Sequence, residues 1–152
     1  MASAARAPAG VRLDVGAALT PDEVNAAYAW VEWPPREAWR LNAINKSCTW
    51  FAAREGDGAL VGVARLLDDG GLDASLWDVI VRPDRQRRGI GRLLVDAVLE
   101  RCRDRSLVAI VSTPAAAGFF ERVGFRTESH GHAAMYLRPH RYDTSHGPNT
   151  PE

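Results

Sequence analysis

The chain has 152 residues, of which 46% are hydrophobic, and its 19 basic residues are balanced by 19 acidic ones. This length fits a single globular domain with a substantial core and is too short for two ordinary domains. Zero net charge argues against a generic polyanion binder, two cysteines are too few for a disulfide scaffold, and no run of about 18 apolar residues is present to span a bilayer.

We therefore expect a cytoplasmic protein with one folded domain at residues 11–138. Residues 1–10 lack the apolar core of a signal peptide and are expected to form a flexible start. Residues 139–152 are polar and have no apolar periodicity, which predicts a flexible tail.

Two helices are expected near the N-terminus, after a short strand at residues 11–15. Thr20 is a favourable N-cap, because a proline and two acidic residues follow it, and this helix should run to about Trp30. The two prolines at 34–35 are expected to open a second short helix, with apolar residues on one face.

Strand signals dominate the middle of the chain. Residues 48–55 and 60–67 are strand-like runs on either side of "GDGA" at 56–59, which indicates a hairpin turn. A second glycine-containing turn, 68–73, leads into the apolar run 74–81.

The apolar spacing then becomes helical. From Gly91 onward it predicts a helix of about 14 residues that begins inside a glycine turn. Residues 106–112 are typical of a short strand buried on both faces, and residues 114–123 of a short helix ended by a glycine. Residues 124–129 and 133–138 are expected to form a closing pair of strands. Strands interrupted by helices indicate a mixed sheet with helices on both faces.

The stretch "RPDRQRRGIGRLL", residues 82–94, places five arginines around two glycines, directly after an apolar strand. A helix that begins in such a turn leaves its first backbone N–H groups unpaired, so they can bind an anion such as phosphate. Gly89 and Gly91 permit positive φ and close approach of a ligand. The alternative is a surface turn with solvated arginines. The Lys-Ser/Thr of a P-loop is absent, and so are the third glycine and later acidic residue of a dinucleotide fold.

The sequence resembles the GNAT superfamily of acetyl-CoA-dependent N-acetyltransferases in two places. "QRRGIG", residues 86–91, matches the family's Q/R-x-x-G-x-G/A loop, and "AGFFERVGF", residues 117–125, resembles its second signature, A-x-F-Y-x-x-x-G-F. The two signatures stand in the family's order, about 30 residues apart, and together are more specific than either alone. The resemblance extends over roughly residues 11–138.

This resemblance implies an α/β (α+β mixed) fold, with a mostly antiparallel mixed sheet of about 6–7 strands splayed after the fourth strand and helices on both faces. It implies that acetyl-CoA lies in the gap, with its pantetheine against the fourth strand and its pyrophosphate in the glycine loop. The cofactor-binding residues implied by position are Val79, Ile80, Val81, Gln86, Arg87, Arg88, Gly89, Ile90, Gly91, Arg92, Ala117 and Phe120.

Asp78 is the candidate general base. Acetyl transfer needs a neutral amine, so a carboxylate, directly or through water, must take a proton from it. Asp78 is the only acidic residue within the apolar run 74–81, and strand alternation places its side chain opposite those of Trp77 and Val79. It is a candidate for both catalysis and substrate binding. The alternative is an ion pair with an arginine.

Phe120 departs from the implied family pattern, which often has a tyrosine there to protonate the leaving thiolate. The loss is tolerable, because a thiol with a pKa of about 8.5 can leave as thiolate and take a proton from water. Tyr136 is the candidate replacement donor, and His130 and His132 are others. For each of them the alternative is a packed aromatic or a solvated loop histidine.

Tryptophans are frequent, with five in the chain. Trp33 and Trp39 fall where the resembling family roofs its acceptor site, and Trp50 lies on a strand. Core packing accounts for any single one, but together they favour an aromatic or apolar acceptor, or a cation held over rings. Trp33, Trp39, Trp50 and Asp78 are the candidate substrate-binding residues.

The function expected is acetyl transfer from acetyl-CoA to the amine of a small molecule, with no metal. The alternatives are an acyl-CoA sensor or scaffold without turnover, and an enzyme that uses another acyl donor or reaction. A nucleic-acid partner is not expected, since no aromatic residue is interleaved with the arginines of the turn. No membrane partner is expected, and the protein is expected to be a monomer or a homodimer.

Overall fold

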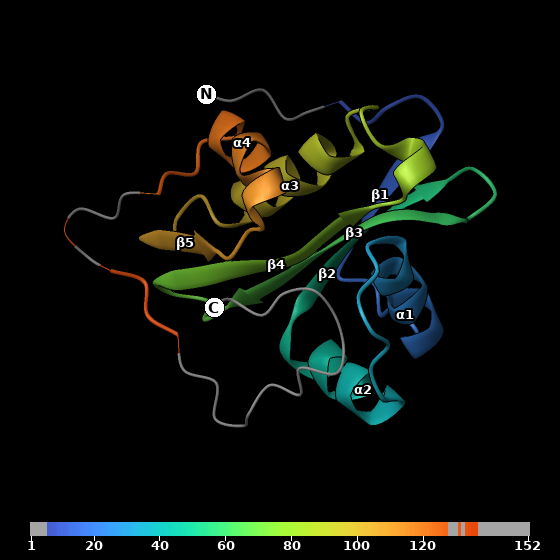
Figure 1. Cartoon of the computed structure of the whole chain (residues 1–152), viewed down its shortest axis with the longest axis horizontal. Coiled ribbons are helices and arrows are strands. Elements are labelled where there is room, and N and C mark those ends of the chain that lie inside the picture. Colours follow the sequence, from blue (N-terminus) through green and yellow to red (C-terminus); the bar gives the residue numbers. More distant parts are fainter. Residues whose placement is uncertain (1–5, 128–130, 132, 137–152) are drawn as a thin grey trace.

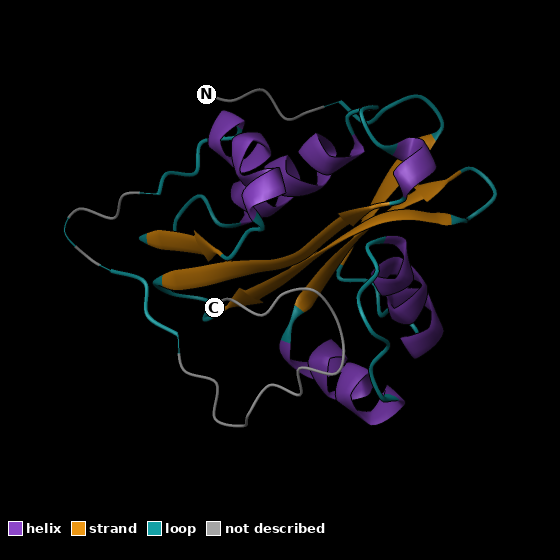
Figure 2. Ribbon diagram, in the orientation of Figure 1, coloured by secondary structure: helices purple, strands orange, loops and turns teal. Residues whose placement is uncertain are grey.

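A twisted sheet of five strands runs through the centre of the molecule, in a computed structural model that describes residues 6–127, 131 and 133–136 (Figures 1 and 2). Its order follows the sequence, β1-β2-β3-β4-β5. The elements are β1 (Val11–Val15), α1 (Pro21–Trp30), α2 (Ala38–Ser47), β2 (Thr49–Glu55), β3 (Leu60–Asp68), β4 (Asp73–Val81), the 3-10 turn η1 (Pro83–Arg85), α3 (Ile90–Arg101), β5 (Leu107–Ile110) and α4 (Pro114–Arg122).

The sheet opens along β4. Strands β1 to β4 pair antiparallel, whereas β5 pairs parallel to β4 and only along Asp73–Leu76. From Trp77 to Val81, β4 keeps β3 on one side and has no strand partner on the other within the described residues. The predicted mixed sheet, splayed at the fourth strand, is confirmed.

Helices cover both faces of the sheet, as predicted. Helices α1 and α2 lie on one face, and α3 and α4 lie on the other (Figure 2). Each face has its own apolar cluster: Leu41 and Trp50 belong to the α1/α2 cluster, and Leu76 and Leu94 to the α3/α4 cluster. The two faces of the sheet therefore have separate apolar cores.

A β-bulge interrupts β4 at Asp78. Val63 pairs with Ile80 and Arg65 with Trp77, so two residues of β4 face one residue of β3. Asp78 has a φ of 49°, which is uncommon for a residue other than glycine. The expectation that Asp78 points away from Trp77 is wrong for this reason: the bulge breaks the alternation, and both side chains lie against Arg65.

Helix α2 begins at Ala38, not at the prolines at 34–35 as expected. The backbone of Arg36 explains the delay: its N–H donates to Asn25 Oδ1 at 2.9 Å, and its carbonyl accepts from Asn25 Nδ2 at 3.0 Å. These bonds hold the segment extended against α1, and a residue that precedes proline also disfavours the helical region. Helix α1, in contrast, runs from Pro21 to Trp30 as predicted.

Strand β5 is exposed at the edge of the sheet within the described residues, contrary to the expectation of a strand buried on both faces. Leu107 is 55% exposed, and no second strand pairs with β5 in the described part of the chain. The expected closing strands are not seen in residues 124–127 and 133–136, which contain no strand, and their other residues lie outside those described. The described sheet thus has five strands and not the expected 6–7.

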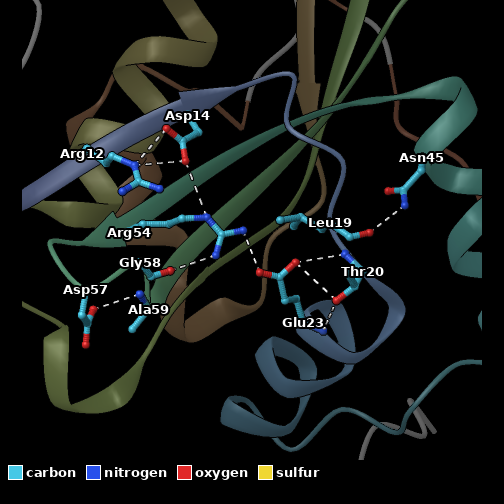
Figure 3. Close-up of polar contacts among 10 residues, drawn as sticks. All are labelled: Arg12, Asp14, Leu19, Thr20, Glu23, Asn45, Arg54, Asp57, Gly58 and Ala59. Atoms are coloured by element: carbon cyan, nitrogen blue, oxygen red, sulfur yellow. Dashed lines mark hydrogen bonds and ion pairs between the residues drawn. The ribbon is translucent and has the colours of Figure 1, made fainter.

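Arg54, on β2, links β1, α1 and the β2–β3 turn (Figure 3). Its guanidinium lies 3.6 Å from Asp14 on β1 and 2.7 Å from Glu23 on α1, and it donates to the carbonyl of Gly58 at 3.1 Å. Helix α1 is thereby tied to the edge of the sheet.

Among the described residues, no helix is long and apolar enough to cross a membrane.

Candidate active site

The glycine turn between β4 and α3 presents a row of free backbone donors. The N–H groups of residues 87–92 donate to no acceptor within the described part of the chain, and the first bond of the helix is Leu93 N–H to Gly89 carbonyl, at 2.9 Å. Arg87 and Gly89 both have positive φ, 59° and 84°, and this alternation turns successive N–H groups toward one side. Such a concave set of amides at a helix N-terminus binds anions.

Only some arginines of the turn are free to support an anion. Arg82 and Arg85 pair with Glu55 and Asp84, and Arg92 pairs with Asp96 at 2.7 Å. Arg87 and Arg88 have no acidic partner among the described residues. The positive charge that faces a ligand is therefore concentrated at the two residues directly before Gly89.

The two glycines of the turn, Gly89 and Gly91, are needed for different reasons. Gly89 has positive φ and nothing closer than Pro8 Cγ, 3.7 Å from where a Cβ would lie, so its space is open. Gly91 has no positive φ, and a Cβ there would lie 3.5 Å from the Phe119 ring. Gly89 is needed for backbone conformation, while Gly91 lies where α3 packs on α4.

The open half of β4 carries unpaired backbone groups next to this turn. Arg82 N–H donates toward β3, to the Val61 carbonyl at 2.9 Å, and the Val81 carbonyl points the other way and accepts from Gln86 Nε2 at 3.1 Å. Directions alternate along a strand, so Val79 presents its N–H and carbonyl to the open side as well. An extended ligand with amide groups can pair with such an edge.

A cavity of about 460 Å³ lies on the opposite face, between β3, β4 and the two N-terminal helices. Its walls combine aromatic and charged side chains, and the bulge places Asp78 among them. The lining residues are Tyr28, Trp33, Arg36, Trp39, Arg40, Ala43, Ile44, Arg65 and Asp78. The bulged residue of β4 thus belongs to the cavity, while Val79, the next residue, belongs to the open edge.

Asp78 is held by two neighbours through one of its oxygens. Its Oδ2 accepts from Arg65 Nε at 2.6 Å and from the Tyr28 hydroxyl at 3.0 Å. Its Oδ1 has no partner among the described residues and is not sealed from solvent. Burial raises the pKa of Tyr28 well above its ordinary value, and the charge of Asp78 adds to this, so Tyr28 stays protonated and donates. One carboxylate oxygen therefore remains available to a ligand.

Arg65 and Tyr28 were not predicted as site residues. The Arg65 guanidinium lies 5.9 Å from the ring centroids of both Trp50 and Trp77, and its side chain is only 14% exposed. An arginine in the middle of the apolar run "LVGVARLL" was the signal that could have found it, because a buried charge requires a partner. Tyr28 carried no such signal, since it has the spacing of a core residue on α1.

The structure brings some predicted substrate residues together and leaves others apart. Trp33 and Trp39 line the cavity with Asp78, 38% and 64% exposed. Trp50 is 2% exposed and does not line it; its Nε1 donates to Asn45 Oδ1 at 2.8 Å. Tyr136 is 70% exposed and is not among the lining residues. His130 and His132 lie outside the described residues.

The second motif, residues 117–125, begins on α4 and ends just after it, on the face of the sheet away from the cavity. Phe120 is buried in the α3/α4 cluster, with its ring 5.0 Å from that of Phe119 and 5.8 Å from that of Phe125. Ala117 is half-buried on the same helix. No group of three or more potential metal-ligating residues occurs in the described residues.

Comparison with known proteins gives one family. Residues 17–125 match the acetyltransferase (GNAT) family. The chain is 28% identical over 117 residues to the uncharacterized N-acetyltransferase ycf52 of Pyropia yezoensis, covering 74% of this chain and 67% of that protein. It is 31% identical over 119 residues to the chloroplastic serotonin N-acetyltransferase 2 of rice, Oryza sativa subsp. japonica, covering 74% of this chain and 56% of that one.

Solved structures show the same fold. A GNAT family acetyltransferase of Streptococcus pneumoniae superposes with a TM-score of 0.73 at 25% identity, covering 87% of this chain and 99% of that one. A putative acetyltransferase of Deinococcus radiodurans gives a TM-score of 0.70 at 26% identity, covering 97% of this chain and 100% of that one.

The regions that match this chain span from 45% to 67% of the length of the first curated relatives.

Proposed function

Because the chain belongs to the acetyltransferase (GNAT) family, we propose that it transfers an acetyl group from acetyl-CoA to the amine of a small acceptor, by direct attack in a ternary complex. One observation carries the proposal: the open edge of β4, which leads into the anion-binding turn, adjoins a cavity that contains a carboxylate with a free oxygen. A donor on one face and an acceptor on the other would meet at residues 78–79.

The residues present fit coenzyme A. The free N–H groups of residues 87–92, with Arg87 and Arg88 beside them, would hold the pyrophosphate, and the backbone of Val79 and Val81 would pair with pantetheine. Bound there, acetyl-CoA would supply an acetyl thioester activated for attack. Gln86 would act on the loop, since its amide fixes the turn to the end of β4.

Asp78 would bind and deprotonate the acceptor amine. Its Oδ2 is occupied by Arg65 and Tyr28, which fixes the carboxylate plane and leaves Oδ1 to accept an N–H of the amine. An alkylamine is mostly protonated at neutral pH, so proton removal at this oxygen, directly or through water, would make the nitrogen nucleophilic.

The departing thiolate would be protonated from solvent. Phe119 and Phe120 carry no hydroxyl, and Tyr136, the donor expected from sequence, is 70% exposed. A thiol with a pKa of about 8.5 leaves without a dedicated acid. Burial raises the pKa of the Cys48 thiol, which keeps it protonated and supports direct transfer over a route through an acetylated cysteine.

The aromatic side chains at the cavity support an aromatic or apolar acceptor. Trp33 and Trp39 are exposed there, and the Tyr28 ring packs edge-on against Trp33 at 5.5 Å. The rice relative named above is a serotonin N-acetyltransferase, which places an aromatic amine among the candidates. The cytoplasmic location, and a monomer or homodimer, stay predictions; three relatives are named as chloroplastic.

A second candidate is a domain that binds an acyl-CoA without turnover. The absence of a hydroxyl at Phe120 favours it. A donor with a different acyl group is the remaining alternative, since no described feature fixes the acyl chain length.

The test measures thiol release from acetyl-CoA against a panel of small amines, with mass spectrometry of the products. We expect amine-dependent release. Asp78→Asn should lower turnover by about 10-fold or more while the acetyl-CoA Kd stays unchanged, and Tyr28→Phe, which keeps the carboxylate, should lower it less. Acetyl-CoA binding without release for any amine would support the sensor, and products from other acyl-CoAs would identify another donor.

A further inference from the structure

We propose that the acceptor carries an acidic group as well as its amine: a carboxylate or a phosphate that binds Arg36 and Arg40 while the amine meets Asp78. This inference rests on the proposed function, because it assigns the substrate class of the same cavity. It also narrows the acceptor, which sequence reasoning left as any aromatic or apolar amine.

The lining of the cavity has more positive than negative side chains. Its lining contains three arginines, Arg36, Arg40 and Arg65, and only one carboxylate, Asp78. Arg65 is already engaged by Asp78 at 2.6 Å. The lining is therefore positively charged as a whole, and the excess belongs to Arg36 and Arg40. A simple cationic amine would be repelled there, whereas an acid group would be attracted.

The two arginines have spare hydrogen-bonding capacity. Arg36 has no ion-pair partner among the described residues. Arg40 contacts Glu37 through Nε at 3.0 Å, but both side chains are more than half exposed, at 55% and 62%, so this pair is weak. A guanidinium has five donors in a planar fork that matches a carboxylate or phosphate.

The backbone of Arg36 and the side chain of Arg40 have contacts that restrain them before a ligand arrives. The backbone of Arg36 is fixed to α1 by the two hydrogen bonds with Asn25, at 2.9 and 3.0 Å. The Arg40 guanidinium lies 4.5 Å from the centroid of the Trp39 ring. Stacking on an aromatic face leaves the in-plane N–H groups of an arginine free to bind a ligand.

The cavity consequently has two ends of opposite charge. At β4, the free Oδ1 of Asp78 accepts from an amine. At the start of α2, Arg36 and Arg40 attract an anion. The two ends belong to one site, because Arg36, Arg40 and Asp78 line the same cavity. A molecule with an amine at one end and an acid at the other fits this polarity.

The experiment compares three acceptors that share one amine: benzylamine, 4-(aminomethyl)benzoate and 4-(aminomethyl)benzylphosphonate. The acid group is remote from the nitrogen, so amine protonation is nearly matched. We expect kcat/KM at least about 10-fold higher for an acid-bearing acceptor than for benzylamine, as one charge-assisted hydrogen bond provides. The better of the two acids identifies carboxylate or phosphate. Equal or higher kcat/KM for benzylamine would overturn the proposal.

Variants assign the effect to the arginines. Arg36→Gln and Arg40→Gln should reduce the ratio of kcat/KM between the acid-bearing acceptor and benzylamine, and the double variant should bring it close to one. Arg103→Gln is the matched control, because Arg103 is 69% exposed on the other side of the molecule and pairs only with neighbouring acids. An unchanged ratio in the double variant would count against these residues.

A binding measurement separates this inference from the proposed function. Benzoate and phenylphosphonate have no amine, and their binding can be followed by calorimetry or by the tryptophan fluorescence of the protein, to which Trp33 and Trp39 in the cavity contribute. If no amine is acetylated, the proposed function fails; tighter binding of either acid to the wild-type protein than to the double variant would still support the acid site. Equal binding to both proteins would overturn it.

Discussion

At the scale of single residues, the backbone of Asp78 decides which face of the sheet its carboxylate reaches. With a φ of 49°, it places its carboxylate on the same side as Arg65 and Trp77, where regular alternation would have turned it toward α3. Its neighbour Val79 stays on the open edge of the strand. Such a conformation is strained in a residue other than glycine, and strain of this kind is commonly retained at functional sites.

Gly89→Ala tests whether the turn decides cofactor affinity. An alanine at a φ of 84° is strained, and its Cβ would enter the open space in front of the free N–H groups, so we expect the acetyl-CoA Kd to rise by about 10-fold or more. Gly70→Ala is the matched control, since Gly70 has a φ of 79° and open space in the β3–β4 turn, at the opposite end of β4 from the glycine turn. Calorimetry gives both values, and equal affinities would refute the assignment.

At the scale of elements, helix α1 positions Tyr28 and is itself fixed at its first turn (Figure 3). Thr20 Oγ1 accepts from Glu23 N–H at 3.2 Å, and Glu23 Oε2 accepts from Thr20 N–H at 3.0 Å, which is a capping box. Arg54 on β2 binds the other Glu23 oxygen at 2.7 Å. Helix α1, whose Tyr28 hydroxyl binds Asp78, is thus connected to β2 through the Glu23 carboxylate.

The pH dependence of stability reports this connection. Partial burial would raise the pKa of Glu23, but hydrogen bonds from Thr20 and Arg54 outweigh it and hold the pKa below its ordinary value of 4.5. A lowered pKa means that the stabilisation is complete above pH 4.5 and is lost as the pH falls through the lower, folded-state value.

We therefore expect Glu23→Gln to reduce the free energy of unfolding by about 1 kcal/mol at neutral pH, and the difference from wild type to shrink below pH 4.5. Urea unfolding followed by circular dichroism across this range is the measurement. A difference that does not vary with pH would mean that the charge of Glu23 contributes nothing.

At the scale of the whole molecule, strand β4 contributes both to the cavity and to the open edge of the sheet. The α1/α2 face holds the cavity, and the open edge of β4 continues into the turn that begins α3 (Figure 1). Because β5 pairs with β4 over only four residues, contacts besides this pairing hold β5, α3 and α4 on the sheet: the apolar cluster beneath α3 and one charged pair. Arg105, just before β5, binds Asp68 at the end of β3 through two bonds of 2.6 and 3.0 Å.

Arg105→Gln should therefore lower the free energy of unfolding, and by more than a fully exposed pair would, because it removes a two-bonded charged pair whose side chains are only 15% and 12% exposed. Arg103→Gln, two residues away in a pair of 69% and 67% exposure, should change it by less than about 0.5 kcal/mol. Denaturant unfolding compares the two. Similar losses of unfolding free energy in both variants would show that the Arg105–Asp68 pair does not help to hold β5 and the two helices beside it on the rest of the sheet.

The sequence by itself determined what depends on neighbours along the chain. The order of helices and strands through residue 122, the cap at Thr20 and the glycine turn before α3 are local features, because backbone propensity, capping and apolar period are set within a few residues. The family resemblance rested on the same kind of contiguous motif and was confirmed by the match over residues 17–125.

Only the tertiary structure decided which side chains meet. Tyr28 and Arg65 reach Asp78 from 50 and 13 residues away, through packing of α1 on the sheet and pairing of β3 with β4. The bulge could not be predicted, since "LWDVIV" reads as an uninterrupted strand and the register shift appears only when β3 is aligned beside it. The excess positive charge of the cavity has the same origin: Arg36 and Arg40 look like solvated residues in sequence, and the fold places them in the lining of the same cavity as Asp78.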